Sequence, residues 1–186
     1  MLGILTQGVF AQSRIPFGPK NSKINSSIKY SVVGQYRANF DRYQGILLFD
    51  EKDNSLKEVS LEIESGSIHS KFLTLDNIVR SKQILNIAKF PRITFQSQSI
   101  TKNEKSYQVK GVLDLHGVKK EFVSTFTLDK FKDEQIGTAT LILKGKWVLK
   151  RKEYGIIWSK LFDHGGVLIG DHLTVEWEIK SPLTIL

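Results

Sequence analysis

Residues 107-YQVKGVLDLHGVKKEF-122 alternate apolar and polar side chains and then break at His116 and Gly117. Successive side chains of an extended chain point to opposite faces, so this alternation predicts a strand with one buried face and one solvated face. Gly117 can adopt turn geometry without steric cost, which indicates that a second strand returns beside the first. We interpret His116 as a residue that holds this turn, although Asp114, on the same strand face, could instead pair with it for acid–base catalysis.

The same period of two recurs along the chain on both sides of this stretch. In 173-LTVEWEIK-180, apolar residues alternate with threonine, glutamate and lysine. Turn-rich segments such as 50-DEKDNS-55 separate neighbouring runs, as expected of hairpin loops. The predicted strands span residues 24–33, 43–50, 57–63, 92–100, 107–115, 121–128, 138–149 and 173–180.

One segment departs from the strand pattern. Over residues 74–80 the apolar side chains share one helical face, Thr74 can serve as the N-cap, and Asp76 lies in the first turn, where the helix dipole favours negative charge. Many strands with one apolar face each, and a single helical crossing, predict a closed antiparallel barrel or a sandwich. A barrel of about eight strands encloses just enough space for packed side chains or for one small ligand.

The composition sets broad limits on function. At 186 residues the chain fits one domain. A net charge of +8 favours anions, which include nucleic acid, acidic lipid head groups and phosphorylated small molecules. The absence of cysteine excludes disulfides, thiolate metal sites and thiol catalysis.

The N-terminal residues 1–20 are expected to form a separate segment. They begin with 1-MLGILTQGVFAQSRIPF-17, in which Val9-Phe10-Ala11 would serve as the cleavage site of a short export signal, although the usual basic start is missing. The segment is therefore either a remnant of such a signal or a stretch that packs on the domain.

Four stretches, in order, are similar to the YceI-like family of polyisoprenoid-binding, lipocalin-like barrel proteins of bacteria. The similarity covers nearly the whole chain, from about residue 24 to residue 180. The stretches are 61-LEIESGSIHS-70, then 76-DNIVRS-81 with 89-KFPRITFQS-97, then Gly111-Val112-Leu113 with Leu115-His116-Gly117-Val118, and last Arg151 to Gly155 with Gly165 to Asp171.

The chain also departs from the family. At the helix, Leu75-Asp76-Asn77-Ile78-Val79 stands where the family often has Arg-Asp-x-His-Leu, and a histidine common in the family's first strand is absent near Val32-Val33. Chemistry based on those histidines is therefore not expected here. The polar end of the ligand is expected to differ from the isoprenoid quinone or prenyl pyrophosphate of the best-known members.

The resemblance implies an all-β fold: an eight-stranded up-and-down antiparallel β-barrel, lipocalin-like, over residues 21–186, with one short helical insertion. It implies a lipid-binding or carrier protein rather than an enzyme, which holds a polyisoprenoid or other long-chain lipid and needs no cofactor. It also implies export, for instance to the periplasm. The expected partners are a long-chain amphipathic lipid and, transiently, an anionic membrane surface, without nucleic acid; the chain would be a monomer or a homodimer.

Apolar residues that face inward are the candidates for contact with the ligand tail, although a solid core would use the same residue types. They are Phe49, Ile63, Ile78, Phe95, Val109, Leu113, Phe122, Phe126, Leu141, Leu143, Trp147, Tyr154, Trp158, Val175 and Trp177. Three basic residues, Arg80, Lys150 and Arg151, are candidates for pairing with an anionic head group. No catalytic and no metal-binding residue is predicted.

Other functions remain open at this point. An enzyme acting on small lipophilic substrates would use His116 or His164 with a carboxylate. The stretch 163-DHGGVLIGDH-172 offers metal ligands, but its glycines are typical of a loop. The stretch 144-KGKWVLKRKEYG-155 interleaves lysines with aromatics, as single-stranded nucleic acid requires, but a strand would point them to opposite faces. A fully packed barrel would act only through its surface.

Overall fold

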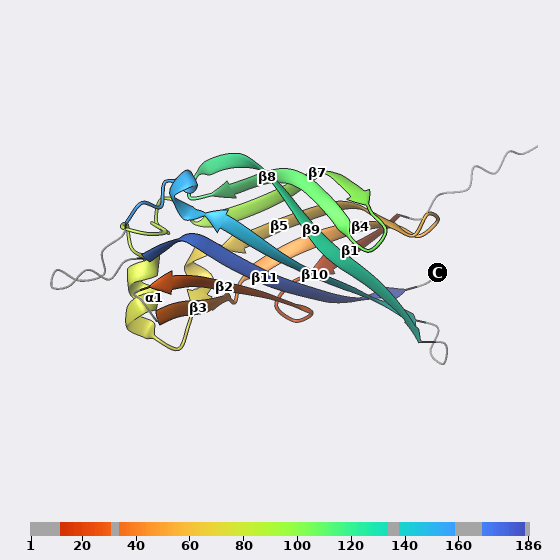
Figure 1. The fold of residues 1–186 in the computed structure, drawn as a ribbon. Coiled ribbons are helices and arrows are strands. Elements are labelled where there is room, and N and C mark those ends of the chain that lie inside the picture. Colours follow the sequence, from red (N-terminus) through yellow and green to blue (C-terminus); the bar gives the residue numbers. More distant parts are fainter. Residues whose placement is uncertain (1–11, 31–33, 134–137, 159–168, 185–186) are drawn as a thin grey trace, which may run out of the picture.

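The protein is a strongly curled antiparallel sheet with one helix at one end (Figure 1). The structure, a computed structural model, describes residues 12–30, 34–133, 138–158 and 169–184. The strands in these residues are β1 (Gln12–Phe17), β2 (Ser22–Tyr30), β3 (Gly34–Phe40), β4 (Tyr43–Asp50), β5 (Ser55–Glu64), β6 (Ile68–His69), β7 (Arg92–Lys102), β8 (Tyr107–Leu115), β9 (Val118–Asp133), β10 (Thr138–Lys150) and β11 (Ile169–Thr184). The helices are α1 (Leu73–Arg80) and two short 3-10 helices, η1 (Ser65–Ser67) and η2 (Arg151–Tyr154).

All eight predicted strands are present, but the prediction of a closed eight-stranded barrel is corrected. The described residues form eleven strands in the order β1-β4-β5-β7-β8-β9-β10-β11-β2-β3-β6, and the edge strands β1 and β6 do not pair with each other. The sheet is therefore a half-barrel. The additional strands are β1, β3 and β6. The sequence places residues 12–17 in the N-terminal segment and predicts no strand over residues 34–40, and β6 is only two residues long.

Two short connections require the sheet to curl. β1 and β2 are consecutive in the chain but lie near opposite ends of the strand order, and only residues 18–21 join them. Four residues span at most about 14 Å, so the two ends of the sheet must approach each other. Asn21 occupies this approach, because its side-chain amide donates to the Pro16 carbonyl at 3.3 Å and to Ser181 Oγ at 3.4 Å. Likewise, only η1 separates β5 from β6 at the far edge.

The interior is densely packed at the end of the sheet opposite α1, toward the hairpin of β4 and β5 (Figure 1). Inward-facing residues there, including Leu47, Phe49 and Leu141, have no exposed surface. The middle of the interior holds a cluster of aromatic rings from β7, β8, β9, β10 and β11, with centroids 5.1 to 6.5 Å apart; its members are Phe95, Tyr107, Phe122, Phe126, Trp147 and Trp177.

The helix forms where it was predicted, but its N-cap differs. Phe72 rather than Thr74 is the N-cap residue, and its side chain makes no capping hydrogen bond. The hydroxyl of Ser70 accepts a hydrogen bond from the Phe72 amide at 3.0 Å, and Asp76 in the first turn is buried. Polar contacts of Ser70, upstream of the helix, and of Asp76, in its first turn, therefore position the helix.

Candidate functional site

An apolar cavity of 140 Å³ lies at the α1 end of the sheet. The surface that its lining residues present to the cavity is apolar. The sheet supplies residues from β2, β3, β5, β6, β7, β8, β10 and β11. The rest of the lining comes from α1, from Arg151 of η2, and from Ile84, Leu85, Ile156 and Trp158. Alternating strand residues point inward, and the apolar face of α1 lies against them. The two-residue period of the strands and the helical period of α1 therefore place apolar side chains around the same cavity.

A second apolar cavity of 50 Å³ lies further along the interior. Four residues line both cavities and form the boundary between them: Ile24, Ile63, Trp147 and Val175. The interior is thus neither an open tube nor a fully solid core. It is hollow near α1, constricted at Trp147, and filled by side chains toward the opposite end.

The predicted tail-contacting residues distribute over three environments. Those that line the larger cavity are Ile63, Ile78, Leu113, Trp147, Trp158 and Val175. Those that line the smaller cavity without reaching the larger are Phe95, Val109, Phe126, Leu143 and Trp177. The remaining four belong to the surrounding packing and line neither cavity: Phe49, Phe122, Leu141 and Tyr154.

Several cavity residues were not among the predicted ones. Tyr36 comes from β3, in which Tyr36, Ala38 and Phe40 alternate with polar residues. This alternation indicates a half-buried strand and could have predicted it. Leu75 and Val79 share the apolar face of α1 with the predicted Ile78. Further lining residues come from segments next to regular elements, namely Ile84, Leu85 and Ile156.

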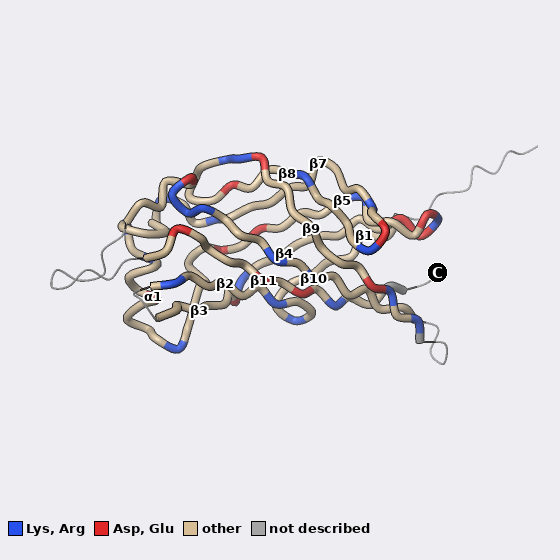
Figure 2. Tube along the Cα trace, viewed as in Figure 1, with Lys and Arg blue, Asp and Glu red and all other residues tan. Residues whose placement is uncertain are grey.

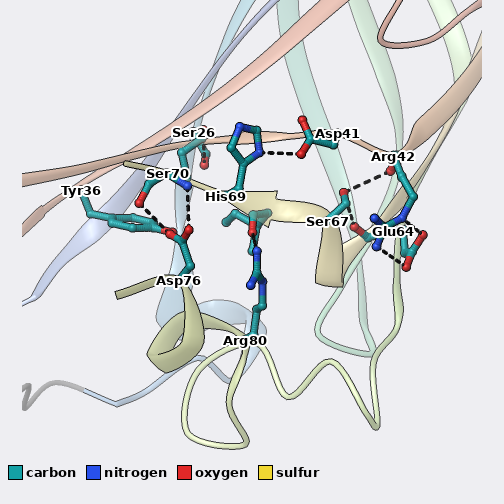
Figure 3. A network of polar contacts seen from close by, with 12 residues as sticks. Ser26, Tyr36, Asp41, Arg42, Glu64, Ser67, His69, Ser70, Asp76 and Arg80 are labelled. Carbon is teal, nitrogen blue, oxygen red and sulfur yellow. Dashed lines mark hydrogen bonds and ion pairs between the residues drawn. The ribbon is translucent and has the colours of Figure 1, made fainter. Parts of the chain in front are cut away.

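A buried polar network holds α1 against the sheet (Figure 3). The carboxylate of Asp76 accepts hydrogen bonds from the Tyr36 hydroxyl at 2.7 Å, from Ser70 Oγ at 2.6 Å and from the Ser70 amide at 2.9 Å. Burial raises the pKa of Asp76, but these donors outweigh it and the net shift is downward. Burial and the bond to the carboxylate raise the pKa of Tyr36. The network is thus stable with Asp76 ionised and Tyr36 neutral.

Arg151 borders the cavity, but its guanidinium is committed to the backbone. It donates to the carbonyls of Ile156 at 2.6 Å, Trp158 at 2.8 Å, Gly170 at 2.9 Å and Ile169 at 3.2 Å. The side chain is 4% exposed, and burial lowers its pKa. The geometry therefore makes Arg151 a clamp between the segment after η2 and the start of β11.

The other two predicted head-group residues do not line the cavity. One guanidinium nitrogen of Arg80 donates to the carbonyl of Ile68, so this side chain points toward β6 (Figure 3). Lys150 is exposed, and its ammonium lies 3.9 Å from Glu153. The structure does not bring Arg80, Lys150 and Arg151 together into one anion site.

His116 holds the turn between β8 and β9. His116 and Gly117 both have positive φ angles, 56° and 73°, as a two-residue hairpin turn requires. Nδ1 of His116 lies 3.1 Å from the carbonyl oxygen of Tyr154, and its ring packs on Phe90 with centroids 4.3 Å apart. His164, the other histidine considered for catalysis, lies outside the described residues.

Among the described residues, no group of three or more side chains of the metal-binding types comes together, and no helix is long and apolar enough to cross a membrane.

A curled antiparallel half-barrel around an apolar cavity, with one helix at its end, defines an all-β protein with an internal apolar site. The chain belongs to the YceI family, because the model of the YceI-like domain matches residues 17–181. Protein YceI of Salmonella newport is 28% identical over 148 residues, which cover 80% of this chain and 78% of that protein. The UPF0312 protein YE1254 of Yersinia enterocolitica is 33% identical over 112 residues, or 60% of this chain, and the matched part is 58% of that protein.

Solved structures share the fold at low identity. BcnA of Burkholderia cenocepacia superposes with a TM-score of 0.73 at 17% identity, covering 86% of this chain and 95% of that one. A polyisoprenoid binding domain of Saccharophagus degradans, implicated in plant cell wall breakdown, superposes with a TM-score of 0.68 at 14% identity, covering 92% of this chain and 98% of that one. The all-β architecture is therefore a shared one.

Proposed function

We propose that the protein binds a long-chain amphipathic lipid, of isoprenoid or fatty type, with part of its tail in the apolar cavity next to α1. The observation that supports this most directly is a cavity whose entire lining surface is apolar in a protein of the YceI family. Each methylene moved from water into such a space contributes about 0.8 kcal/mol. The name of the Saccharophagus domain, polyisoprenoid binding, adds support for this ligand class.

The size of the cavity sets a condition on this proposal. An engineered cavity of about 150 Å³ holds a benzene molecule, so the 140 Å³ found here fits one ring or a few methylenes. A longer tail has to displace side chains at the Trp147 constriction, move α1 outward, or extend from the mouth. We infer that binding enlarges the cavity.

The polar end of the ligand would remain outside this space. The surface that faces the cavity is apolar. The guanidinium of Arg151 already donates to four carbonyls and lies 3.7 Å from the carboxylate of Asp171, so a charged head group inside would lose its hydration without gaining partners. Export to the periplasm, transient contact with an anionic membrane and a monomeric or homodimeric state are parts of the same proposal.

The alternative of an enzyme using His116 has less support. Nδ1 of His116 faces a backbone carbonyl, whereas a catalytic imidazole needs a partner acid or nucleophile. The alternative of a packed barrel is weakened by the two cavities, although it describes the end of the interior opposite α1.

The test compares one substitution at two valines. Val175→Trp places an indole at the boundary between the two cavities, whereas Val123→Trp places it on the outer face of β9, where Val123 is 50% exposed. Native mass spectrometry after incubation with a prenyl alcohol and with a fatty acid measures occupancy. We expect wild type and Val123→Trp to take up lipid and Val175→Trp to take up much less while unfolding cooperatively.

Two outcomes would count against the proposal. One is a wild-type protein that neither retains cellular lipid nor takes up either probe. The other is a folded Val175→Trp variant with undiminished uptake, which would place the ligand elsewhere.

A further inference from the structure

The α1 end of the molecule exposes large apolar side chains beside the cavity. Phe72 and Leu73, consecutive residues at the start of α1, are 59% and 68% exposed, and Ile157, between the cavity residues Ile156 and Trp158, is 70% exposed. Adjacent exposed phenylalanine and leucine are unfavourable in water, and such a patch marks a surface that meets an apolar partner.

The segment around α1 carries an excess of positive charge. Residues 70–91 contain Lys71, Arg80, Lys82 and Lys89, and their one acidic residue, Asp76, is buried in the network with Tyr36 and Ser70. Both Lys71 and Lys82 are exposed, and neither takes part in an ion pair within the described ranges.

Two lysines of β10 are in a different situation. Acidic and basic residues are interspersed along the sheet (Figure 2). Lys144 lies 3.2 Å from Glu178, and Lys146 lies 3.2 Å from Glu176. Positive charge and exposed apolar side chains therefore coincide beside the cavity, whereas lysines along β10 are paired.

We propose that this end of the protein docks on an anionic lipid bilayer, with Phe72 and Leu73 entering the interface and Lys71 and Lys82 lying against the head groups. Basic residues next to apolar ones are the combination that holds a protein reversibly in the plane of an anionic membrane. Docking in this orientation turns the cavity toward the lipid, so that a tail need not cross water to reach it. This step rests on the proposed lipid-binding function and adds the surface through which the ligand arrives.

Sedimentation with vesicles tests the docking. The full chain is mixed with vesicles of phosphatidylcholine and phosphatidylserine in equal parts, or of phosphatidylcholine alone. We expect binding to the anionic vesicles only, weakened by salt, and reduced about fivefold for each of Lys71→Gln and Lys82→Gln. The matched charge control is Lys144→Gln, which removes a paired lysine and should leave vesicle binding unchanged.

The apolar contribution has its own control. Phe131 is 59% exposed, as Phe72 is, but it lies two residues before the end of β9, and β9 ends at the side of the sheet opposite α1 (Figure 1). Phe72→Ser combined with Leu73→Ser should abolish measurable sedimentation, and Phe131→Ser should not change it. Equal loss in both would overturn the proposed orientation.

The two proposals fail separately. Occupancy by a dispersed prenyl alcohol, measured without vesicles, should be the same for Phe72→Ser/Leu73→Ser and wild type. A wild type that takes up this probe yet binds no anionic vesicle overturns the docking and leaves the cavity function standing. Loss of self-association in the Phe72→Ser/Leu73→Ser variant, with vesicle binding unchanged, would assign the surface to a second copy and would also overturn docking.

Discussion

The phenolic hydroxyl of Tyr36 donates a 2.7 Å hydrogen bond to the carboxylate of Asp76 and thereby joins β3 to α1 across one side of the cavity. Asp76 is 2% exposed and accepts two more hydrogen bonds from Ser70, the residue that follows β6. The position of α1 over the cavity therefore depends on one buried carboxylate more than on capping of the helix.

Removal of this carboxylate should loosen α1. Asp76→Ala leaves the Tyr36 hydroxyl and the Ser70 donors without an acceptor, and each hydrogen bond to a charged group contributes about 1.5–3 kcal/mol. We expect a loss of about 3 kcal/mol in the free energy of unfolding, measured by urea denaturation. The exposed neighbour in the control, Asn77→Ala, should change it by less than about 0.5 kcal/mol. A near-equal effect of the two substitutions would contradict this role.

The same network predicts that the stability of the fold decreases at both low and high pH. The pKa of Asp76 is lowered in the folded state, so its contribution to stability is present above the unfolded pKa, near 4, and is lost as the pH falls through the folded value. The pKa of Tyr36 is raised, so its contribution is present below about pH 10 and is lost as the pH rises. We expect the urea midpoint of Asp76→Asn to fall less than that of wild type when the pH is lowered from 8 to 2.

Replacement of Arg151 by lysine should lower the stability of the fold. A guanidinium reaches four carbonyls at once, whereas an ammonium is a compact donor that cannot span them. Arg151→Lys should therefore lower the free energy of unfolding by about 2 kcal/mol or more, and should reduce lipid occupancy because Ile156 and Trp158 lose their anchor. Lys150→Met, on the exposed neighbour, serves as the control and should leave the thermal midpoint in place.

The hairpin turn should not tolerate a side chain at Gly117. A Cβ there would lie 2.5 Å from Cε1 of Phe90, on a residue whose φ of 73° already disfavours other residues by about 1–2 kcal/mol. Gly117→Ala is expected to cost at least that amount in the free energy of unfolding. At Gly170 the nearest atom to an added Cβ is 3.4 Å away, so Gly170→Ala should have a much smaller effect. Comparable losses at both glycines would refute the strain argument.

The sequence predicted the parts of the fold that obey a local period. The strands 43–50 and 107–115 have the predicted bounds, because alternation of burial ends at a turn that the sequence marks. The strands β1 and β6 were missed for a different reason. Each is fixed by pairing with a strand distant in the chain, β1 with β4 and β6 with β3, and such pairing leaves little trace in so short a stretch.

The candidate site was predicted less completely, again for a physical reason. Inward orientation follows from strand period, but whether an inward residue lines a hollow or a packed region depends on all its neighbours. Phe49 and Trp147 illustrate this, since both face inward, yet Phe49 is in the solid part and Trp147 lines both cavities. The backbone partners of the Arg151 guanidinium could not be predicted from the sequence, because every residue has a carbonyl.

The solid packing around Leu47, Phe49 and Leu141 closes the interior at the end opposite α1. A ligand tail that enters beside α1 therefore cannot pass through to the far end of the interior, and any enlargement has to occur on the side of α1. Release of a bound tail would then depend on displacement of α1, which the hydrogen bonds to Asp76 oppose.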